Sequence, residues 1–362
     1  MIVFLRSHDI KSDGRLQKYI SVLKKRNIDY KAIFWSRDKV FQNDNFYTSF
    51  NLRSETGRGL MNLHKIFLFN IWIFFKLFSK RTEIKTVHAV DLDTIIPALF
   101  FSKIFQKKLI YDIFDMTSES RKMNETLRKF FFNIERYIAK QADYLLLPHS
   151  IRFDQLDLAK NKSRIIIENV PMNYFSSKSS EVKFIYEKKF SYIGILQRKH
   201  RGIENIIEFF KANQDYTLDI AGHGELEEEI ALCSKNYKNI NFHGRLNYQD
   251  ALSLMMASDV ILGLYYKSIR NHQFASPNKY YEHLMIGKPL VTSFGTMPGN
   301  LVESFKTGWA VQDNYNSFEN IMKSIDDDQI RSMSMNASTL WMEKYCNYDK
   351  EVLEKIYLEI IL

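Results

Sequence analysis

Short apolar runs recur along the chain, and a stretch with helical periodicity follows nearly every one. Nearly all of the runs are continuously apolar and do not alternate with polar residues, which is typical of strands in a parallel sheet covered on both faces. They predict strands at 2–5, 29–35, 86–90, 109–113, 144–147, 165–167, 190–195, 217–221, 240–243, 260–264, 289–293 and 308–311. The clearest helical stretches between them are 15–25, 93–105, 127–140, 203–210 and 226–234.

This alternation predicts an α/β fold of doubly wound, Rossmann-like domains. A chain of 362 residues is too long for one typical core. The series of strands breaks once, after Asn169-Val170-Pro171, at a polar stretch rich in serine. We therefore expect a first domain at 1–170, a linker at 171–189 and a second domain at 190–345. We expect residues 346–362 to form a C-terminal helix that either caps the second domain or returns to the first.

Composition restricts the class of protein. Hydrophobic residues at 45% and charged residues at 26% indicate a folded globular chain. Cys233 and Cys346 are too few for a disulfide framework or a zinc site, and no secretory signal begins the chain, so we expect a cytoplasmic protein. The net charge of +9 indicates an anionic partner. Nucleic acid is disfavoured, because the basic residues are not interleaved with aromatics as in a single-strand platform.

The aromatic run at 66–78, with Phe74, Phe75 and Lys76 near its end, suggests a second anionic partner. It is shorter than the ~20 apolar residues of a membrane-spanning helix. It could lie in the membrane interface with its rings inserted and its lysines at anionic headgroups. The alternative is a buried helix packed on a sheet.

The stretch 275–292 contains the most informative single motif. Ser276 is a candidate N-cap, Pro277 suits the first helical position, and Gly287 suits a left-handed C-cap. A helix start with free N–H groups at Asn278 and with Lys279 beside it can hold phosphate. Glu282, one turn further, could accept hydrogen bonds from a ribose. An ordinary capped helix would have the same pattern.

Three more strand ends carry glycine. Gly194 ends one strand and precedes a basic loop, in which Arg198 and Arg201 are candidates for holding a diphosphate, although a solvated basic turn is the alternative. Gly222-His223-Gly224 is a second strand-to-helix turn, but it lacks the third glycine and the downstream spacing of the dinucleotide-binding motif. Gly244-Arg245 follows one unit later, where backbone near Gly244 could bond a nucleotide base.

Taken in order, these loops resemble a GT-B glycosyltransferase of family 4, the group that uses nucleotide-sugar donors with retention of configuration. In the first half, 87–94 and 109–115 resemble that family's paired strand ends, and Glu135-Arg136 with Ala142-Asp143 matches the helix before the next strand. The resemblance implies two Rossmann-like domains facing a cleft, with the donor bound by the second and the acceptor by the first.

The resemblance also implies roles. Glu282 would bind the donor ribose, and Ser276, Pro277, Asn278 and Lys279 would surround the phosphates. Arg198 or Arg201 would offset charge on the departing nucleotide diphosphate. Gly14, in Asp13-Gly14-Arg15, lies where the family's donor-contacting loop follows the first strand. A UDP- or GDP-sugar is the expected co-substrate, with no cofactor and no metal.

Two positions depart from the family pattern. Phe274 stands where a sugar-binding glutamate is expected, and Phe114 stands where a histidine is common. His88, Asp91 and Asp115 are candidate substitutes, and we include Asp91 and Asp115 among the catalytic residues.

We therefore expect a retaining hexosyltransferase that acts on a saccharide or lipid-linked acceptor in bacterial cell-surface polysaccharide synthesis, peripheral at the inner face of the plasma membrane. The main alternative is a catalytically inactive GT-B scaffold that serves another glycosyltransferase as partner subunit. A nucleotide-sugar epimerase, or another α/β nucleotide enzyme on a similar fold, is a third possibility.

Overall fold

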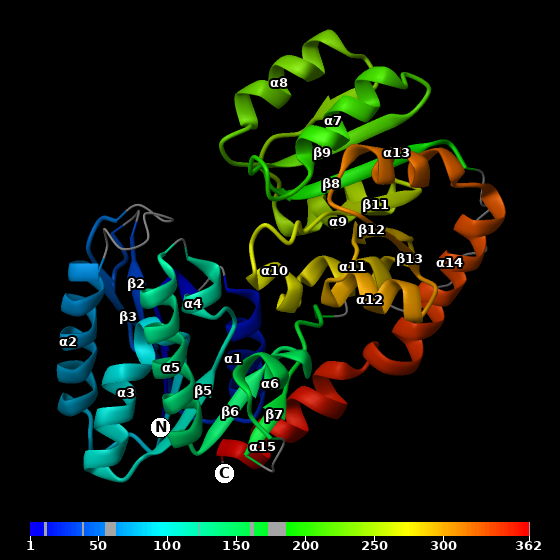
Figure 1. Cartoon of the computed structure of the whole chain (residues 1–362). Helices are drawn as coiled ribbons and strands as arrows, with labels where there is room; N and C mark the ends of the chain where they lie inside the picture. The colour runs from blue at the N-terminus through cyan, green and yellow to red at the C-terminus, as the bar shows by residue number, and fades with distance from the viewer. Residues whose placement is uncertain are drawn as a thin grey trace. The chain divides into compact units, whose positions relative to one another are not determined.

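The computed structural model describes residues 1–10, 13–37, 40–54, 63–121, 123–159, 163–172 and 186–361. The chain divides into two compact units, one of Met1–Glu168 with Asp349–Leu362 and one of Asn169–Tyr348 (Figure 1). The linker expected at 171–189 falls largely on 173–185, outside the described residues.

Within the described ranges, the first unit is built on a parallel sheet of order β3-β2-β1-β4-β5-β6-β7. Strand order reverses between β1 and β4, and open sheets of this kind bind ligands at the carboxyl ends of their strands beside such a reversal. The strands are β1 (Ile2–Arg6), β2 (Tyr30–Ser36), β3 (Tyr47–Asn51), β4 (Thr86–Val90), β5 (Lys108–Asp112), β6 (Tyr144–Leu147) and β7 (Arg164–Ile166).

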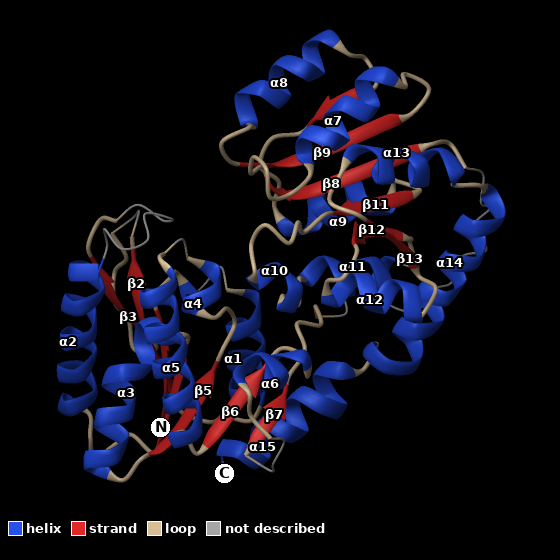
Figure 2. Ribbon diagram, in the orientation of Figure 1, coloured by secondary structure: helices blue, strands red, loops and turns tan. Residues whose placement is uncertain are grey.

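Helices cover both faces of this sheet (Figure 2). Phe69, Ile73 and Ile95 belong to the core on the face covered by α2, α3 and α5. Leu16 and Tyr19 of α1 belong to the core on the opposite face. The helices are α1 (Gly14–Lys25), α2 (Leu63–Ser79), α3 (Leu92–Phe105), α4 (Thr117–Ser120), α5 (Glu125–Gln141) and α6 (Ile151–Leu156).

The second unit repeats the plan with a parallel sheet of order β10-β9-β8-β11-β12-β13 over the described residues. Its strands are β8 (Lys189–Ile195), β9 (Thr217–His223), β10 (Ile240–Phe242), β11 (Val260–Gly263), β12 (Leu290–Ser293) and β13 (Gly308–Val311). Its helices are α7 (Ile203–Ala212), α8 (Glu227–Asn236), α9 (Tyr248–Met256), α10 (Asn271–Phe274), α11 (Asn278–Ile286), α12 (Met297–Ser304), α13 (Tyr315–Ser324) and α14 (Asp327–Leu340).

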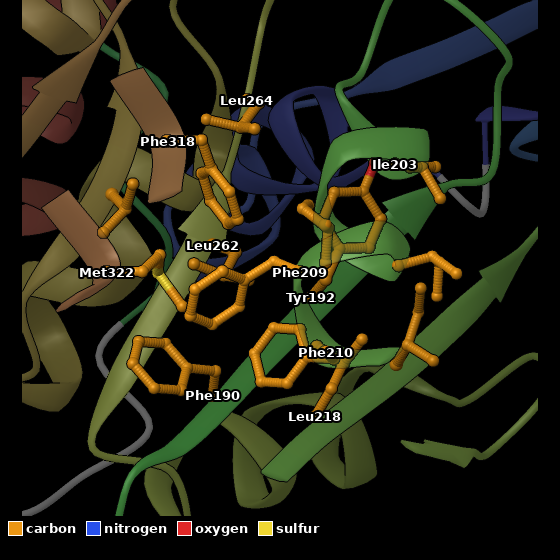
Figure 3. Packing of buried hydrophobic residues seen from close by; sticks show 14 of the residues in the cluster. Phe190, Tyr192, Ile203, Phe209, Phe210, Leu218, Leu262, Leu264, Phe318 and Met322 are labelled. Atoms are coloured by element: carbon orange, nitrogen blue, oxygen red, sulfur yellow. The ribbon is translucent and has the colours of Figure 1, made fainter. Parts of the chain in front are cut away.

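Several aromatic side chains contact one another in the hydrophobic core of the second unit (Figure 3). Phe209 lies edge-on to Phe210 and to Phe318, at centroid distances of 5.4 Å and 5.8 Å, and Phe190 packs on Phe210 at 5.7 Å. These rings come from β8, α7 and α13. Edge-to-face packing between elements far apart in sequence fixes the helices on the sheet beyond what area burial alone provides.

The predicted strands are all present, with ends that coincide with the prediction or differ from it by at most two residues, and β3 is an additional strand. Its sequence, Tyr47-Thr48-Ser49-Phe50-Asn51, is polar, and β3 pairs only with β2 at the edge of the sheet. An edge strand needs no continuous apolar run, because only one of its sides is bonded to a neighbouring strand. β3 therefore lacks the apolar pattern that marks the other strands.

The C-terminal segment is not the single helix that was predicted. After α14, the backbone widens into two π-helical stretches, η3 (Trp341–Tyr345) and η4 (Asp349–Glu354), before α15 (Lys355–Ile361). Glu354 accepts hydrogen bonds from Lys25 Nζ and Arg26 Nε, both at 2.7 Å, and Tyr357 is buried in the first unit's core. This segment therefore completes the first unit.

The close approach of β9 to β8 supports a stability prediction. A Cβ at Gly222, whose φ is +150°, would lie 1.8 Å from the Gly194 carbonyl oxygen. Gly222→Ala is therefore expected to destabilise the protein by about 3 kcal/mol or more, measured by denaturant unfolding. Gly194→Ala is the matched control, because its added Cβ would meet only Tyr192 at 3.5 Å. Equal stability of the two variants would contradict this account.

Among the described helices, none combines the length and apolar character needed to cross a bilayer.

Candidate functional site

A pocket of about 360 Å³ lies at the carboxyl ends of β8 and β11 in the second unit. It brings together residues from four separate stretches of sequence, including most of the predicted phosphate loop. It is lined by Tyr192, Ile193, Gly194, Ile195, Arg201, Gly263, Leu264, Tyr265, Pro277, Asn278, Lys279 and Glu282. The carboxyl ends of parallel strands are the general ligand-binding edge of such sheets, so this pocket is the candidate functional site.

The first turn of α11 forms one wall of the pocket. The helix begins at Asn278, and Pro277 is its N-cap with an extended backbone. The prediction that Ser276 caps this helix is wrong, because Pro277 is not yet helical. The Ser276 hydroxyl instead lies 3.0 Å from the Tyr281 hydroxyl, and Ser276 does not line the pocket. Gly287 ends the helix in the left-handed conformation, as predicted.

Lys279 and Glu282 are both buried where they line the pocket. Burial lowers the pKa of the Lys279 ammonium, and the nearby Glu282 carboxylate opposes this shift. Burial likewise raises the pKa of Glu282, while Lys279 and a hydrogen bond from Tyr248 oppose it. An anion bound next to Lys279 would stabilise its protonated form, so the first turn of α11 is built to receive negative charge.

Gly263 and Tyr265 are pocket residues that the sequence did not reveal. A Cβ at Gly263 would lie 2.6 Å from Cδ of Lys279, so this glycine makes room for the lysine stem. The guanidinium carbon of Arg201 lies over the Tyr265 ring, 4.8 Å from the ring centroid. Neither residue stands in a recognisable motif, because each acts through a side chain that is distant in sequence.

The structure separates the two arginines of the basic loop. Arg201 lines the pocket, and its Nε is buried without a hydrogen-bond partner among the described residues. Arg198 does not line the pocket; its Nη2 pairs with Glu229 at 2.7 Å on the surface. Of the two candidates for a diphosphate partner, Arg201 is thus the one placed to meet a ligand.

The remaining glycine-rich loops of the second unit lie outside the pocket lining. Gly222 donates its N–H to the Gly244 carbonyl at 2.8 Å, which ties the ends of β9 and β10 together. Gly244 has a φ of +63° in the turn after β10, and Arg245 is exposed. The geometry gives these residues a role in shaping the edge of the sheet.

In the first unit, charged side chains gather where β1, β4 and β5 end. Arg6 Nη1 pairs with Asp91 at 2.5 Å, and Asp91 also accepts the N–H groups of Phe114 at 2.8 Å and Asp115 at 3.2 Å. Burial raises the pKa of Asp91 to about 6, and Arg6 opposes this shift. The Asp115 carboxylate is largely exposed and lies 3.4 Å from Arg152 Nη2.

Other candidates of the first unit have structural surroundings. His88 is fully buried, with Nδ1 2.8 Å from the Tyr357 hydroxyl and Nε2 3.4 Å from Asp112. Phe114 lies against the guanidinium groups of Arg6 and Arg15, at 4.6 Å and 5.1 Å. Gly14 is the first residue of α1, with no heavy atom within 4 Å of an added Cβ. Phe274 ends α10, half-buried and outside the pocket lining.

Glu135, on α5, holds the start of α4 and should make stability depend on pH. It is fully buried and accepts hydrogen bonds from Thr117 N at 2.7 Å and from Ser118 N and Oγ at 3.3 Å and 2.7 Å. Burial raises its pKa from 4.5 to about 7. The folded state therefore binds this proton more tightly than the unfolded state, so the stability it confers is complete below the ordinary pKa and is lost as pH rises through 7. The fall in Tm over this range should be smaller in Glu135→Gln, and equal pH profiles would contradict the assignment.

The aromatic helix α2 is partly buried and partly exposed. Phe69, Ile73 and Leu77 face the core, whereas Phe75 and Lys76 are exposed and Phe74 is half-buried. The buried-helix alternative describes the face that packs on the core, and contact of the exposed face with a membrane stays a prediction.

Known proteins share both sequence and fold with this chain. Residues 177–339 match the family model described as glycosyl transferases group 1. The uncharacterized glycosyltransferase MJ1069 of Methanocaldococcus jannaschii is 22% identical over 330 residues, which cover 82% of this chain and 80% of the relative.

Two solved structures extend the comparison over nearly the whole length. Anabaena HepE in complex with UDP-glucose superposes with a TM-score of 0.67 at 14% identity, covering 99% of this chain and 98% of that one. WaaG, a glycosyltransferase involved in lipopolysaccharide biosynthesis, superposes with a TM-score of 0.66 at 12% identity, covering 99% of each chain. The predicted fold class is confirmed. Residues 177–339 in the second half of the chain thus match the glycosyl transferases group 1 family, and the whole chain has the GT-B fold of glycosyltransferase structures.

Proposed function

We propose that this enzyme transfers a hexose, with retention of anomeric configuration, from a UDP- or GDP-sugar to a saccharide or lipid-linked acceptor in cell-surface polysaccharide synthesis. The observation that carries the proposal is the pocket of the second unit, which combines two cationic side chains, a helix N-terminus and a buried carboxylate. The UDP and UDP-glucose in the Anabaena HepE structures and the lipopolysaccharide role of WaaG support the donor class and the pathway class.

Each pocket group has a role in this proposal. The diphosphate lies at the N–H groups that begin α11, between Arg201 and Lys279, and Glu282 accepts hydrogen bonds from the ribose hydroxyls. Gly194 allows the donor to approach backbone, and Gly263 leaves room for the Lys279 stem. Arg201 and Lys279 supply the positive charge at the diphosphate, so the proposal assigns no metal and no cofactor.

The proposed transfer exchanges one bond for another at the anomeric carbon. The bond from this carbon to the diphosphate oxygen breaks, and the acceptor hydroxyl oxygen bonds to the same carbon from the same face. The hydroxyl proton passes to an oxygen of the departing nucleotide diphosphate. Arg201 and Lys279 act by stabilising the negative charge that develops on that diphosphate.

We assign acceptor recognition to the first unit, with Asp91 and Asp115 as hydrogen-bond acceptors for its hydroxyl groups. Both lie at the carboxyl edge of the sheet, where a ligand is expected. Arg6 and the N–H groups of Phe114 and Asp115 hold the Asp91 carboxylate in place.

The direct test is turnover of a panel of UDP- and GDP-sugars by the full chain, with and without saccharide and lipid-linked acceptors, followed by NMR of the product linkage. The proposal expects one nucleotide series to bind and a product with the donor's anomeric configuration. An inverted product would refute retention. Nucleotide binding without turnover of any donor or acceptor would favour the inactive scaffold, for which Phe274 and Phe114 are the supporting observations.

We also propose that the enzyme is cytoplasmic and peripheral at an anionic membrane, with the exposed side of α2 as the contact. Replacing Phe75 with Ser and Lys76 with Gln should weaken binding to phosphatidylglycerol vesicles, measured by sedimentation, about thirtyfold, because an inserted ring and a lysine near the surface each contribute about 1 kcal/mol. Adding Phe74→Ser should deepen the loss. The control is Phe130→Ser with Lys140→Gln on α5, whose Phe130 is 57% exposed. Equal sedimentation of variant and control would exclude α2 as the contact.

A further inference from the structure

An apolar trough of about 610 Å³ runs along the first unit between α2 and α3. These two helices lie side by side in Figure 1, and α5 borders the trough. Phe67, Ile71 and Phe75 recur every four residues on α2, so they form one row along that helix. Ile96, Phe100 and Ile104 form the matching row on α3. Side chains of both rows are exposed by 40% to 65%. Contiguous apolar surface of this kind on a folded unit indicates a binding site.

One end of the α2–α3 trough carries charge. Arg121 and Asp93 line it there, and Arg121 Nη2 lies 2.8 Å from both Asp93 oxygens. The Ser7 hydroxyl donates to the same carboxylate at 2.9 Å, and Arg37 Nε donates to the Ser7 carbonyl at 3.1 Å. Two guanidinium groups thus act on one carboxylate, because both Arg121 and Arg37 lower the pKa of Asp93 against the effect of burial. This end is suited to a further anion.

The charged end also points to the proposed acceptor site. Asp93 follows Asp91 by two residues at the start of α3, at the carboxyl edge of the sheet. The trough therefore leads from the side chains assigned to the acceptor sugar, past a guanidinium group, into an apolar channel. A lipid-linked sugar has these same three parts in the same order: sugar, phosphate and hydrocarbon chain.

Size and polarity favour a single hydrocarbon chain as the occupant. The volume is that of a pocket for one small ligand. A peptide would bring backbone polar groups that the apolar rows cannot hydrogen-bond, which makes a protein partner unfavourable. The sequence of α2 contains no Asp or Glu, and Asp93 is the one acidic residue of α3, so the walls do not repel a phosphorylated lipid.

We propose that the α2–α3 trough binds the hydrocarbon chain of a lipid-linked acceptor, with the lipid phosphate at Arg121 and the sugar toward Asp91. The inference rests on the proposed function and narrows it, since it selects a lipid-linked acceptor over a free saccharide. Affinity should then rise with chain length, by about fourfold for each methylene group that becomes buried.

The test measures binding of farnesyl phosphate to the full chain by calorimetry, with dimethylallyl phosphate as the short-chain comparison. Farnesyl phosphate should bind saturably and at least about a hundredfold more tightly than the short analogue. Phe100→Ser should weaken it about tenfold, and Phe67→Ser with Phe100→Ser should weaken it further. Phe130→Ser is the matched control, because Phe130 is 57% exposed, close to the 60% of Phe100, and lies outside the trough.

A second arm tests the orientation. Arg121→Gln should weaken farnesyl phosphate about tenfold and leave farnesol unchanged, because only the former carries the anion. An equal loss for both ligands would overturn the assignment of the phosphate to Arg121.

Two outcomes would overturn the trough assignment itself. One is equal affinity of the Phe100→Ser and Phe130→Ser proteins for farnesyl phosphate. The other is absence of saturable farnesyl phosphate binding from a chain that still sediments with phosphatidylglycerol vesicles, which would make this face a bilayer contact only. Binding of UDP and GDP is measured on the same samples, so a failed donor pocket, which concerns the proposed function, is distinguished from a failed trough.

Discussion

Replacing Arg201 with Met is expected to lower kcat/KM for nucleotide-sugar turnover by about 10²–10³-fold, chiefly through kcat. The guanidinium group lies over the Tyr265 ring at 4.8 Å, in a pocket that it lines together with the buried Lys279 and Glu282. Charge held in such a site is screened less than charge on the surface, and it needs no reorientation when the donor bond breaks. Initial-rate kinetics over a range of donor concentrations would separate the kcat effect from the KM effect.

Arg198→Met provides the control for this prediction. Arg198 lies three residues earlier in the same loop, but it pairs with Glu229 on the surface, where an exposed ion pair contributes about 1 kcal/mol at most. Its turnover should stay within about threefold of the unmodified enzyme. A larger loss for Arg198→Met than for Arg201→Met would show that the loop adopts another arrangement around the donor and that the roles are reversed.

Replacing Glu282 with Gln is expected to weaken nucleotide diphosphate binding by about 10–100-fold. The buried carboxylate can accept two ribose hydroxyl groups, whereas the amide offers one acceptor and a donor that meets Lys279 unfavourably. Calorimetry with UDP and GDP measures the loss directly. The 2′,3′-dideoxy diphosphate of the preferred base should bind the two proteins with similar affinity, because it has no ribose hydroxyl to offer.

The comparison of the dideoxy with the normal nucleotide distinguishes loss of a ribose contact from a general loss of structure. Glu225→Gln is the matched control, because Glu225 is exposed in the same unit and accepts a hydrogen bond from the Arg198 N–H. If the dideoxy nucleotide lost as much affinity as the normal one in Glu282→Gln, the carboxylate would act by holding Lys279 and not by binding ribose.

The sequence was most informative where one strong physical requirement determines residue choice. Strands buried on both faces need largely apolar runs, which is why 144–147 and 308–311 were predicted with the observed bounds. The same requirement is absent at the sheet edge, where β3 was missed. The continuous C-terminal helix was predicted wrongly because apolar spacing does not distinguish α-helical turns from the wider π-helical turns after Leu340.

The candidate site was only partly predictable for a related reason. Loops at strand ends are rich in glycine, proline and basic residues. Gly194 and 277–279 could therefore be predicted as site residues from the composition and order of these loops. Which of two neighbouring arginines faces inward depends on Tyr265, more than sixty residues away along the chain. The α2–α3 trough is still less visible, since neither helix alone has a concave surface.

The return of the C-terminal segment to the first unit affects how the protein folds while it is synthesised on the ribosome. Multidomain chains generally fold from the N-terminus as they are made. Here Tyr357, Leu353 and Ile360 fill one core of the first unit, so that core is incomplete until the ribosome has passed them. The second unit, whose residues end at Tyr348, has its full sequence available earlier. The first unit, although its synthesis begins first, therefore keeps an uncovered apolar face until the C-terminal segment docks on it.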